Sequence, residues 1–341
     1  MSLWYTLVRQ YVSIGISIYF KEIRVTGTEN IPLEGPIMFT VNHQNSFLDA
    51  LLIATSNNRH THFLVRADAF KFRIVRWFFN SINMMPIYRL RDGRRSLSIN
   101  DQIFQKCFTI LANNHALMLF PEADHHQKRL LLPLSKGFTR IALGSDNTIM
   151  IVPVGINYTH HRFFGGSVSI YYGKPISTLT YQNGEPQDNR LLRNEVNLQM
   201  QKLITCIPDD PNYQVLEDHL NQTPMVYLDP EYCNQWVSQA DSEHLSIVNQ
   251  VKKPAWFRAW ARALSSLLNF PPLVLCSQVL KKLNDPVFTG SIKLITGIIL
   301  LPIYYLLLAL IVYTVWSFWG AMAVIVLCIL SLMARKWSLT Y

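Results

Sequence analysis

Charged residues are scarce in this chain of 341 residues: Asp, Glu, Lys and Arg make up 16% of it, against about a quarter in a typical soluble domain. Half of the residues are hydrophobic, which excludes intrinsic disorder, because disordered chains have low hydrophobicity. The 14 glycines are too few for a collagen-like chain. The five cysteines are scattered and form no C-x-x-C pair, which argues against a disulfide framework and a zinc knuckle.

Acidic residues are the scarcer of the two charged classes. There are 22 Asp and Glu against 31 Lys and Arg, which gives a formal net charge of +9. A basic balance of this size indicates an anionic partner, and both nucleic acid and the surface of a membrane fit it. The position of the apolar residues decides between these partners.

The C-terminal part of the chain lacks charge altogether over a long run. From Leu294 to Ala334, 41 residues pass without one Asp, Glu, Lys or Arg. One transmembrane helix needs about 20 apolar residues, so the run predicts two helices, with a break among the aromatic residues 316–320. Lys293 precedes the run, and Arg335 and Lys336 follow it. The positive-inside bias therefore predicts a hairpin with both ends on the cytoplasmic side. The competing reading is a buried pair of core helices in a soluble protein.

Two further segments are typical of a membrane interface. Residues 252–262 are basic and aromatic and contain no acid, which predicts an interfacial helix whose cations face lipid phosphates. Its place beside the hairpin favours lipid over nucleic acid as the partner. Residues 1–20 are apolar and aromatic, are interrupted by Arg9 and are followed by no small-residue cleavage site. They predict a membrane-docking helix rather than a signal peptide.

Between residues 21 and 225 short apolar runs alternate with longer helical patterns. This alternation predicts an α/β domain with a mostly buried mixed sheet flanked by helices. The expected strands are Pro36–Val41, His62–Val65, Met84–Tyr88, Ala116–Phe120, Met150–Asn157 and Ser167–Tyr172, and the expected helices are Leu48–Thr55, Phe70–Asn80, Ser98–Ala112, Lys136–Leu143 and Arg190–Ile204. A linker with the interfacial region is expected over residues 226–292 and the transmembrane hairpin over 293–341.

The first candidate for chemistry follows the strand that ends at Val41. His43 stands in the expected turn and Asp49 enters from the next helix. A carboxylate that accepts a hydrogen bond from one ring nitrogen fixes the histidine tautomer and supports positive charge when the other nitrogen takes a proton. The pair is therefore a candidate general base. Taken alone, the spacing is also compatible with a chance pairing, since the chain has 10 histidines.

Three more candidates follow later strands. Residues 89–95 hold four arginines in seven positions, and guanidinium groups can clamp a phosphate or form an ordinary solvated loop. Glu122 follows Pro121 at a strand end, where it can accept hydrogen bonds from substrate hydroxyls or hold an arginine. Pro153 lies within a strand, a position more typical of a sheet edge or a wall of the site.

The order of these motifs resembles the four sequence blocks of the glycerolipid acyltransferase family, typified by lysophosphatidic acid and glycerol-3-phosphate acyltransferases. The resemblance covers about residues 25–173. Asn42, His43 and Asp49 resemble the His–Asp block, and Arg89 resembles the phosphate-binding arginine. Phe120-Pro121-Glu122 and Val152-Pro153-Val154 resemble the third and fourth blocks, and the stretch from Asn284 to Phe288 through the hairpin resembles a tail of some bacterial members.

The chain departs from the family pattern at two places. Five residues separate His43 from Asp49, where four are usual, and Leu48 occupies the usual Asp position; the longer spacing resembles that of the fungal glycerol-3-phosphate enzymes. Ala123 stands where Gly is usual. If that position needs a positive φ, alanine would be strained there, and otherwise its methyl group narrows the site.

The resemblance implies direct acyl transfer in phospholipid synthesis. His43 would take the proton of a hydroxyl of 1-acyl-glycerol-3-phosphate, Asp49 would orient His43, and Arg89, helped by Arg91, would hold the phosphate. Acyl-CoA or acyl carrier protein would be the co-substrate, and no other cofactor and no metal ion is expected. Glycerol-3-phosphate is the alternative acceptor.

Two other classes stay open at this point. A metallohydrolase would use the histidine pairs His60/His62, His125/His126 and His160/His161, although no recognised metal-ligand spacing joins them. A membrane protein that binds lipid without catalysis is the other alternative, kept open by the long His–Asp spacing and by Ala123.

Overall fold

The structure is a computed structural model that describes residues 2–88, 94–122, 124–182, 184–185, 187–239 and 254–339. Among the positions singled out from the sequence, Arg89, Arg91, Ala123, Lys252 and Lys253 lie outside the described residues.

The centre of the molecule is one mixed sheet with the strand order β1-β7-β6-β2-β5-β3-β4, and β8 pairs with β6. Its strands are β1 (Glu22–Thr26), β2 (Ile37–Val41), β3 (Thr61–Arg66), β4 (Met84–Ile87), β5 (Ala116–Leu119), β6 (Met150–Tyr158), β7 (Ser167–Tyr172) and β8 (Ile176–Ser177). β7 and β8 run antiparallel to β6, and the other pairs are parallel. Every residue of β2 and of β5 is buried, which explains why these strands read as continuous apolar runs.

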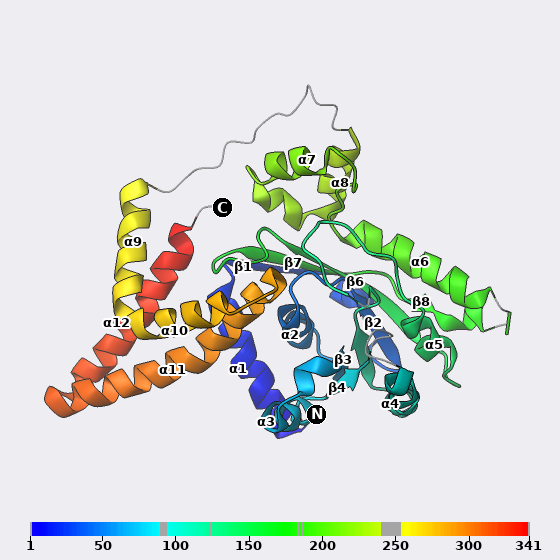
Figure 1. Ribbon diagram of the computed structural model, residues 1–341, viewed down its shortest axis with the longest axis horizontal. Helices are drawn as coiled ribbons and strands as arrows, with labels where there is room; N and C mark the ends of the chain where they lie inside the picture. Colours follow the sequence, from blue (N-terminus) through cyan, green and yellow to red (C-terminus); the bar gives the residue numbers. More distant parts are fainter. Residues whose placement is uncertain are drawn as a thin grey trace.

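Helices cover both faces of this sheet, as predicted (Figure 1). They are α1 (Leu3–Tyr19), α2 (Phe47–Ser56), α3 (Arg73–Ser81), α4 (Arg94–Ala112), α5 (Gly137–Leu143) and α6 (Asp188–Leu203). Side chains of α1 and α2 share one hydrophobic core with Phe39 and Val152. Side chains of α4, α5 and α6 form the second core with Met38 and Ile151. Because successive strand residues point to opposite faces, neighbouring residues of β2 and β6 enter different cores.

A smaller cluster caps the end of the α/β region. It contains α7 (Tyr213–Leu220) and α8 (Pro230–Gln239), which pack around buried Tyr227. Short 3-10 turns complete the domain and its junctions: η1 (Thr28–Asn30), η2 (Ala67–Phe70), η4 (Thr178–Tyr181), η5 (Pro224–Leu228) and η6 (Pro286–Phe288).

The C-terminal region folds as four helices: α9 (Ala255–Leu268), α10 (Phe270–Lys281), α11 (Thr289–Val315) and α12 (Phe318–Ser338). The helical segment Pro286–Val315 and α12 are both long and apolar enough to cross a membrane, which confirms the predicted pair of apolar helices. The chain turns between them at Trp316 and Ser317, within the expected break. α9 and α10 meet at an angle of 92° and pack on α12 and α11 respectively.

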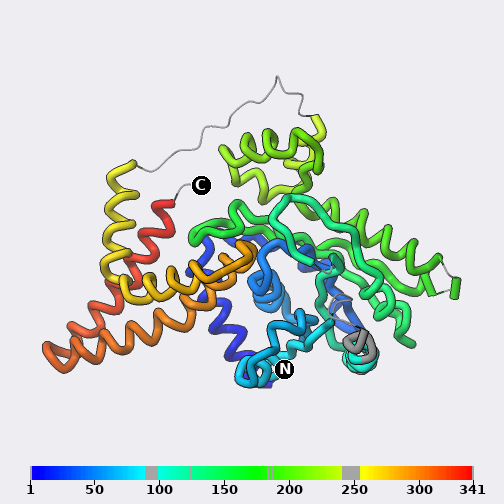
Figure 2. The backbone as a smooth tube through the Cα atoms, viewed as in Figure 1, coloured from blue at the N-terminus to red at the C-terminus, as the bar shows by residue number. Residues whose placement is uncertain are grey.

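The N-terminal helix and the hairpin lie side by side, as Figure 2 shows. The hydroxyl of Tyr11 in α1 donates to the backbone carbonyl of Ile298 in α11. Gly15 of α1 also faces Ile298, whose side chain leaves no room for a larger residue at that position. The first helix is therefore packed both on the sheet and on a helix that can cross a membrane.

Candidate active site

The site begins where β2 ends, at the carboxyl edge of the parallel strands. Asn42 follows β2, and its side-chain amide exchanges two hydrogen bonds with the backbone of Ile156 in β6, at 3.0 and 2.7 Å. These bonds tie the end of β2 to its neighbour strand and fix where the chain leaves the sheet. The structure therefore gives Asn42 a bracing contact, while its predicted contact with substrate stays a prediction.

His43 and Asp49 come together as the sequence predicts. Nδ1 of His43 lies 3.0 Å from Oδ2 of Asp49, which stands in the first turn of α2. Asp49 is fully buried, and the His43 side chain is 10% exposed. A carboxylate at Nδ1 selects the tautomer with the proton on that nitrogen, which leaves the lone pair on Nε2.

The Asp49 carboxylate accepts three further hydrogen bonds. Oδ2 accepts from the backbone N–H groups of Gln44 and Asn45, at 3.0 and 2.8 Å. Oδ1 accepts from the hydroxyl of Tyr158 at 2.5 Å. Burial, followed by the Asp49 charge, raises the pKa of Tyr158 well above its ordinary value, so the phenol stays a donor. Sequence reasoning missed Tyr158, because it lies at the far end of β6.

The five-residue spacing between His43 and Asp49 is accommodated by a turn at Ser46. Ser46 has φ 50° and ψ −128°, a conformation that is strained for a residue with a side chain and costs on the order of 1–3 kcal/mol. The backbone N–H of Leu48 donates to the Asn45 carbonyl at 3.1 Å. The extra residue thus forms a tight turn that still delivers Asp49 to His43.

Phe120 and Glu122, which follow β5, contact His43 as well. The ring of Phe120 stacks on the imidazole with a centroid distance of 3.6 Å. The buried carboxylate of Glu122 accepts the backbone N–H of His43 at Oε1, at 2.8 Å. Its Oε2 accepts the N–H of Leu132 at 2.8 Å and lies 3.1 Å from Nε2 of His126. Glu122 thereby fixes the backbone of His43, and its predicted contact with a substrate hydroxyl or an arginine stays a prediction.

The two prolines singled out from the sequence lie in the frame of the site. Pro153 is buried in β6, opposite Thr40 of β2, and its carbonyl accepts the N–H of Gly173. The carbonyl of Pro121 accepts the N–H of Ser135 at 2.8 Å. Pro153 thus lies in an interior strand, between β7 and β2, and not at a sheet edge. The predicted substrate contacts of both prolines stay predictions.

The start of the membrane hairpin is bonded into the catalytic loop. Ser291, in the first turn of α11, accepts the N–H of Leu48 at 2.9 Å and donates to the carbonyl of Asn45 at 2.7 Å. A Cβ atom at Gly290 would lie 2.6 Å from Oδ1 of Asn45 and 2.7 Å from the carbonyl oxygen of His161. The loop between His43 and Asp49 therefore depends on a segment almost 250 residues away.

A second contact joins the hairpin to the site through His125. Its ring lies edge-on to His43, with a centroid distance of 5.7 Å. Nε2 of His125 lies 2.8 Å from Oδ2 of Asp285, just before the hairpin. Burial works against the charged form of Asp285, yet hydrogen bonds from His125 and the backbone of Val287 hold its pKa below the ordinary value. Asp285 thus positions a ring that packs against the catalytic imidazole.

A polar pocket of about 560 Å³ adjoins the loop, with Lys128, His161, Arg162 and Asp209 among its lining residues. Gln44 connects it to the His–Asp pair, because its side chain bonds to His161 at 3.1 Å and to the carbonyl of Lys128 at 3.2 Å. The pocket carries both signs of charge. The contacts of Gln44 with His161 and Lys128 are therefore the link between this pocket and the residue next to His43.

The comparison with known families decides the class of this site. Residues 22–157, which include His43, Asp49 and Glu122, match the Acyltransferase family model. This chain carries an acyltransferase domain.

Similar proteins share parts of the chain. The chain is 33% identical over 96 residues to glycerol-3-phosphate O-acyltransferase 1 of Saccharomyces cerevisiae, a match covering 26% of this chain and 13% of that protein. Glycerol-3-phosphate O-acyltransferase 2 of the same yeast is 34% identical over 82 residues, which cover 23% of this chain and 11% of that protein. The chain therefore spans only about an eighth of the length of these two curated relatives.

More distant similarities extend further along the chain. An uncharacterised acyltransferase of Schizosaccharomyces pombe is 20% identical over 258 residues, covering 50% of this chain and 38% of that protein. The crystal structure of the 1-acyl-sn-glycerophosphate (LPA) acyltransferase of Thermotoga maritima gives a TM-score of 0.44 at 22% identity, covering 57% of this chain and 76% of that one.

Tyr158→Phe removes one donor from the Asp49 carboxylate of the acyltransferase domain. We expect the Asp49 carboxylate to be held less firmly against Nδ1 of His43, so that the imidazole is oriented less well for taking a proton. Turnover should fall about tenfold, because a buried acceptor loses one partner. The measurement is acyl transfer against pH. Tyr172→Phe, which removes a buried hydroxyl bonded to Ser56 instead, is the matched control; equal profiles for both variants would contradict the assignment.

Gly290→Ala tests the bond between hairpin and catalytic loop. The new Cβ displaces Asn45, so we expect acyl transfer to fall on the order of tenfold to a hundredfold, because misplacing a catalytic group by about 1 Å has effects of that size. Gly297→Ala on the same helix is the control, since its Cβ would meet only Leu301 at 3.9 Å. Both variants are compared for membrane insertion and activity. Equal activity of the two would show that the loop does not depend on the hairpin.

Proposed function

We propose that this chain moves a fatty acyl group from an acyl thioester to a hydroxyl of 1-acyl-glycerol-3-phosphate in phospholipid synthesis, with His43 as the general base. The observation that carries the proposal is the buried Asp49 carboxylate, 3.0 Å from Nδ1 of His43, inside an acyltransferase domain. A histidine held in this way is the group that acyl transfer to an alcohol requires.

The proposed reaction balances without a metal ion or a bound cofactor. Nε2 of His43 takes the proton of the acceptor hydroxyl as its oxygen attacks the thioester carbonyl, and Asp49 supports the imidazolium. The tetrahedral intermediate collapses, the carbon–sulfur bond breaks, and the thiolate leaves with the proton from His43. General acid–base help of this kind is worth about 10²–10⁴-fold. The thioester comes from acyl-CoA or acyl carrier protein.

The two substrates must be held by groups other than His43. We assign the acceptor phosphate to Arg89 and Arg91, because a guanidinium group matches a phosphate with two parallel hydrogen bonds. Both arginines follow β4 in the sequence, and β4 is parallel to β2 through β3 and β5, so the carboxyl end of β4 lies at the sheet edge that carries His43. The polar pocket beside Gln44 is a second place for a polar substrate group.

The bonds between the hairpin and the loop favour an acceptor that is itself a lipid. Ser291 belongs to a helix that can cross a membrane and touches the backbone of the catalytic turn. His43 therefore lies beside the place where the chain enters the bilayer, within reach of a monoacylated acceptor whose tail stays in the lipid. Glycerol-3-phosphate is the second candidate acceptor, supported by the similarity to the two yeast glycerol-3-phosphate O-acyltransferases.

We also propose how the chain sits on the membrane. α11 and α12 cross as a hairpin with both ends on the cytoplasmic side, since Arg335 and Lys336 end the second helix. α1 packs on α11 and exposes Leu7 and Ile14, and α3 exposes Ile74 and Trp77. The indole of Trp4 in α1 bonds to Ser81 at the end of α3. These two helices form one apolar surface beside the hairpin, which suits the headgroup layer.

His43→Ala should abolish acyl transfer. Membranes containing the chain are given an acyl thioester with either 1-acyl-glycerol-3-phosphate or glycerol-3-phosphate, and thiol release is followed. Release that depends on the first acceptor and falls at least a hundredfold in the variant supports the proposal. His219→Ala is the control, because His219 lies in α7 and stacks on Trp236 away from the site. Preference for glycerol-3-phosphate would select the second candidate, and release that survives His43→Ala would exclude the mechanism.

Quenching by brominated lipids tests the surface formed by α1 and α3. In proteoliposomes, Trp77→Phe should remove fluorescence that brominated acyl chains quench, because Trp77 is 67% exposed on the proposed membrane face. Trp236→Phe, in α8 of the capping cluster, should remove only unquenched fluorescence. If both variants lose the same unquenched component, α3 does not touch the bilayer.

A further inference from the structure

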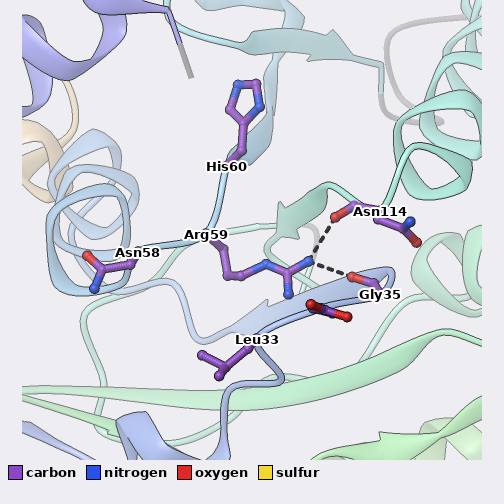
Figure 3. Close-up of a pocket in the computed structure, with 7 residues that line it drawn as sticks. Leu33, Gly35, Asn58, Arg59, His60 and Asn114 are labelled. Atoms are coloured by element: carbon purple, nitrogen blue, oxygen red, sulfur yellow. Dashed lines mark hydrogen bonds between the residues drawn. The ribbon is translucent and has the colours of Figure 1, made fainter.

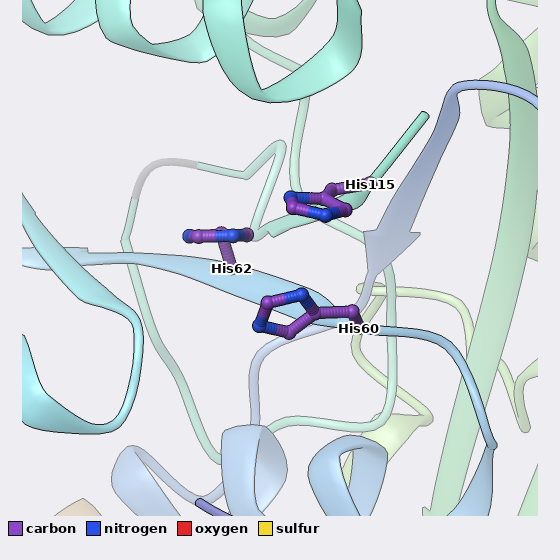
Figure 4. Close-up of side chains that lie close together, drawn as sticks. All are labelled: His60, His62 and His115. Atoms are coloured by element: carbon purple, nitrogen blue, oxygen red, sulfur yellow. The ribbon is translucent and has the colours of Figure 1, made fainter. Parts of the chain in front are cut away.

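Three histidines gather at the edge of the sheet opposite the catalytic pair. His60 and His62 are two residues apart around the start of β3, so they point to the same face of the strand. His115 directly precedes β5, whose Ala116 pairs with Thr61 in a parallel register. The backbone N–H of Ala116 donates to the carbonyl of His60. The pairing of these two strands therefore brings the three imidazoles together, as Figure 4 shows.

The distances among the rings suit one shared ion. One nitrogen from each of the three histidines lies within 4.8 Å of the others. The ring centroids of His60 and His115 are 4.4 Å apart, and that of His62 lies 5.1 and 5.4 Å from them. Zinc binds imidazole nitrogen at about 2.0–2.1 Å in a tetrahedron, which places ligand nitrogens about 3.4 Å apart. Side-chain rotations that move the ring nitrogens by roughly 1 Å would bring the nitrogen–nitrogen distances to this value with the backbone in place.

One nitrogen of the cluster is buried without a partner. Nε2 of His62 is shielded from solvent and has no hydrogen-bond partner among the described residues. A buried polar atom without a partner is unfavourable, and a metal ion bound at that nitrogen would supply the missing partner.

An ion can reach the cluster from solvent. His60 also lines a surface pocket of about 410 Å³, together with Leu33, Glu34, Gly35, Asn58, Arg59 and Asn114 (Figure 3). The cation of Arg59 in this pocket is already bound to backbone carbonyls of Pro32, Gly35 and Asn114. The Glu34 carboxylate at the same pocket favours entry of a cation. Beside the cluster, Nδ2 of Asn83 lies 2.8 Å from Nε2 of His60. With this amide turned over, its oxygen would accept from the Nε2–H group and leave Nδ1 of His60 for the ion.

We propose that His60, His62 and His115 bind one divalent transition-metal ion, zinc, and that a water molecule completes the tetrahedron. The ion would join β3 to β5 where both strands begin. His43 follows the carboxyl end of β2, and these strands are parallel, so the ion lies at the opposite edge of the sheet and takes no part in acyl transfer. Its role is to fasten the strands, distinct from the metallohydrolase considered from the sequence.

The test measures binding of zinc itself to the full chain, purified in detergent through an affinity tag without histidine. Wild-type protein should keep one zinc per chain after dialysis, and cobalt should give the strong visible absorption of a tetrahedral site. Loss of an outer contact to a metal ligand typically costs 10–100-fold in affinity, so loss of a ligand in His62→Gln should cost more than about a hundredfold. His115→Gln, which alters a less buried ring, is the second variant, and His219→Gln is the control.

Each outcome decides the proposal. Zinc and cobalt binding that falls in both cluster variants and is unchanged in His219→Gln supports it. Absence of stoichiometric zinc and of the tetrahedral cobalt band in wild-type protein overturns it. Binding that persists in His62→Gln and His115→Gln overturns it as well, because the ion would then sit at other histidines. If His62→Gln does not fold, His115→Gln alone carries the comparison. Activity enters none of these readouts, so the result is independent of the proposed acyl transfer.

Discussion

The site depends on one buried negative charge, the carboxylate of Asp49. An ionised carboxylate in a protein interior is very costly unless it is paired and hydrogen-bonded. Asp49 meets this requirement with four partners: the His43 ring, two backbone N–H groups of the turn and the Tyr158 hydroxyl. Three of these partners come from the loop after β2 and one from β6, while Asp49 itself stands in α2. The same carboxylate that orients His43 therefore also joins the elements around it. Glu122 acts in a similar way on the other side of His43, because its buried carboxylate accepts a hydrogen bond from the backbone N–H of His43.

A second constraint joins the turn between His43 and Asp49 to a helix that is long and apolar enough to cross a membrane. Ser46 adopts a strained conformation, and its side chain makes no capping hydrogen bond to α2. Ser291 supplies both a donor and an acceptor to this turn, and Gly290 lets the helix approach closely enough to do so. A hairpin that only anchored the domain would not need these contacts. The geometry of the His43–Asp49 pair and the position of the hairpin therefore depend on each other.

Much of the architecture could be predicted from the sequence, because its causes are local. Strands buried on both faces are continuous apolar runs, so the six expected strands agree with the structure to within one or two residues. The charge-free run predicts α11 and α12 with their turn for the same reason. β1 was missed, because four of its five residues are exposed and charged residues interrupt it. The sharp bend at Asn269 was also missed, although Pro271 and Pro272 in the first turn of α10 are a local signal for a new helix start. The Asn269 side chain also bonds to Tyr305 and Ser331 of the hairpin.

The site shows the same division between local and long-range causes. His43 and Asp49 could be paired from the sequence, because the strand, the turn and the helix between them are all close in the chain. Tyr158 and Asp285 could not be paired with them, because their positions depend on the order of the strands and on the docking of the hairpin. His60 and His62 show their common face in the sequence, but His115 joins them only once β5 is known to lie beside β3.

The parallel strands explain why the two histidine groups do not interfere. In a parallel sheet all carboxyl ends meet at one edge and all amino ends at the other. His43 follows β2 and therefore belongs to the carboxyl edge, where it meets the start of the hairpin through Asn45 and Ser291. His60 and His115 precede their strands and belong to the amino edge, where Asn83 and Arg59 hold the chain in place. An ion at that edge would fasten the start of strands whose far ends carry the chemistry. It would stiffen the sheet without altering the charge that Asp49 presents to His43.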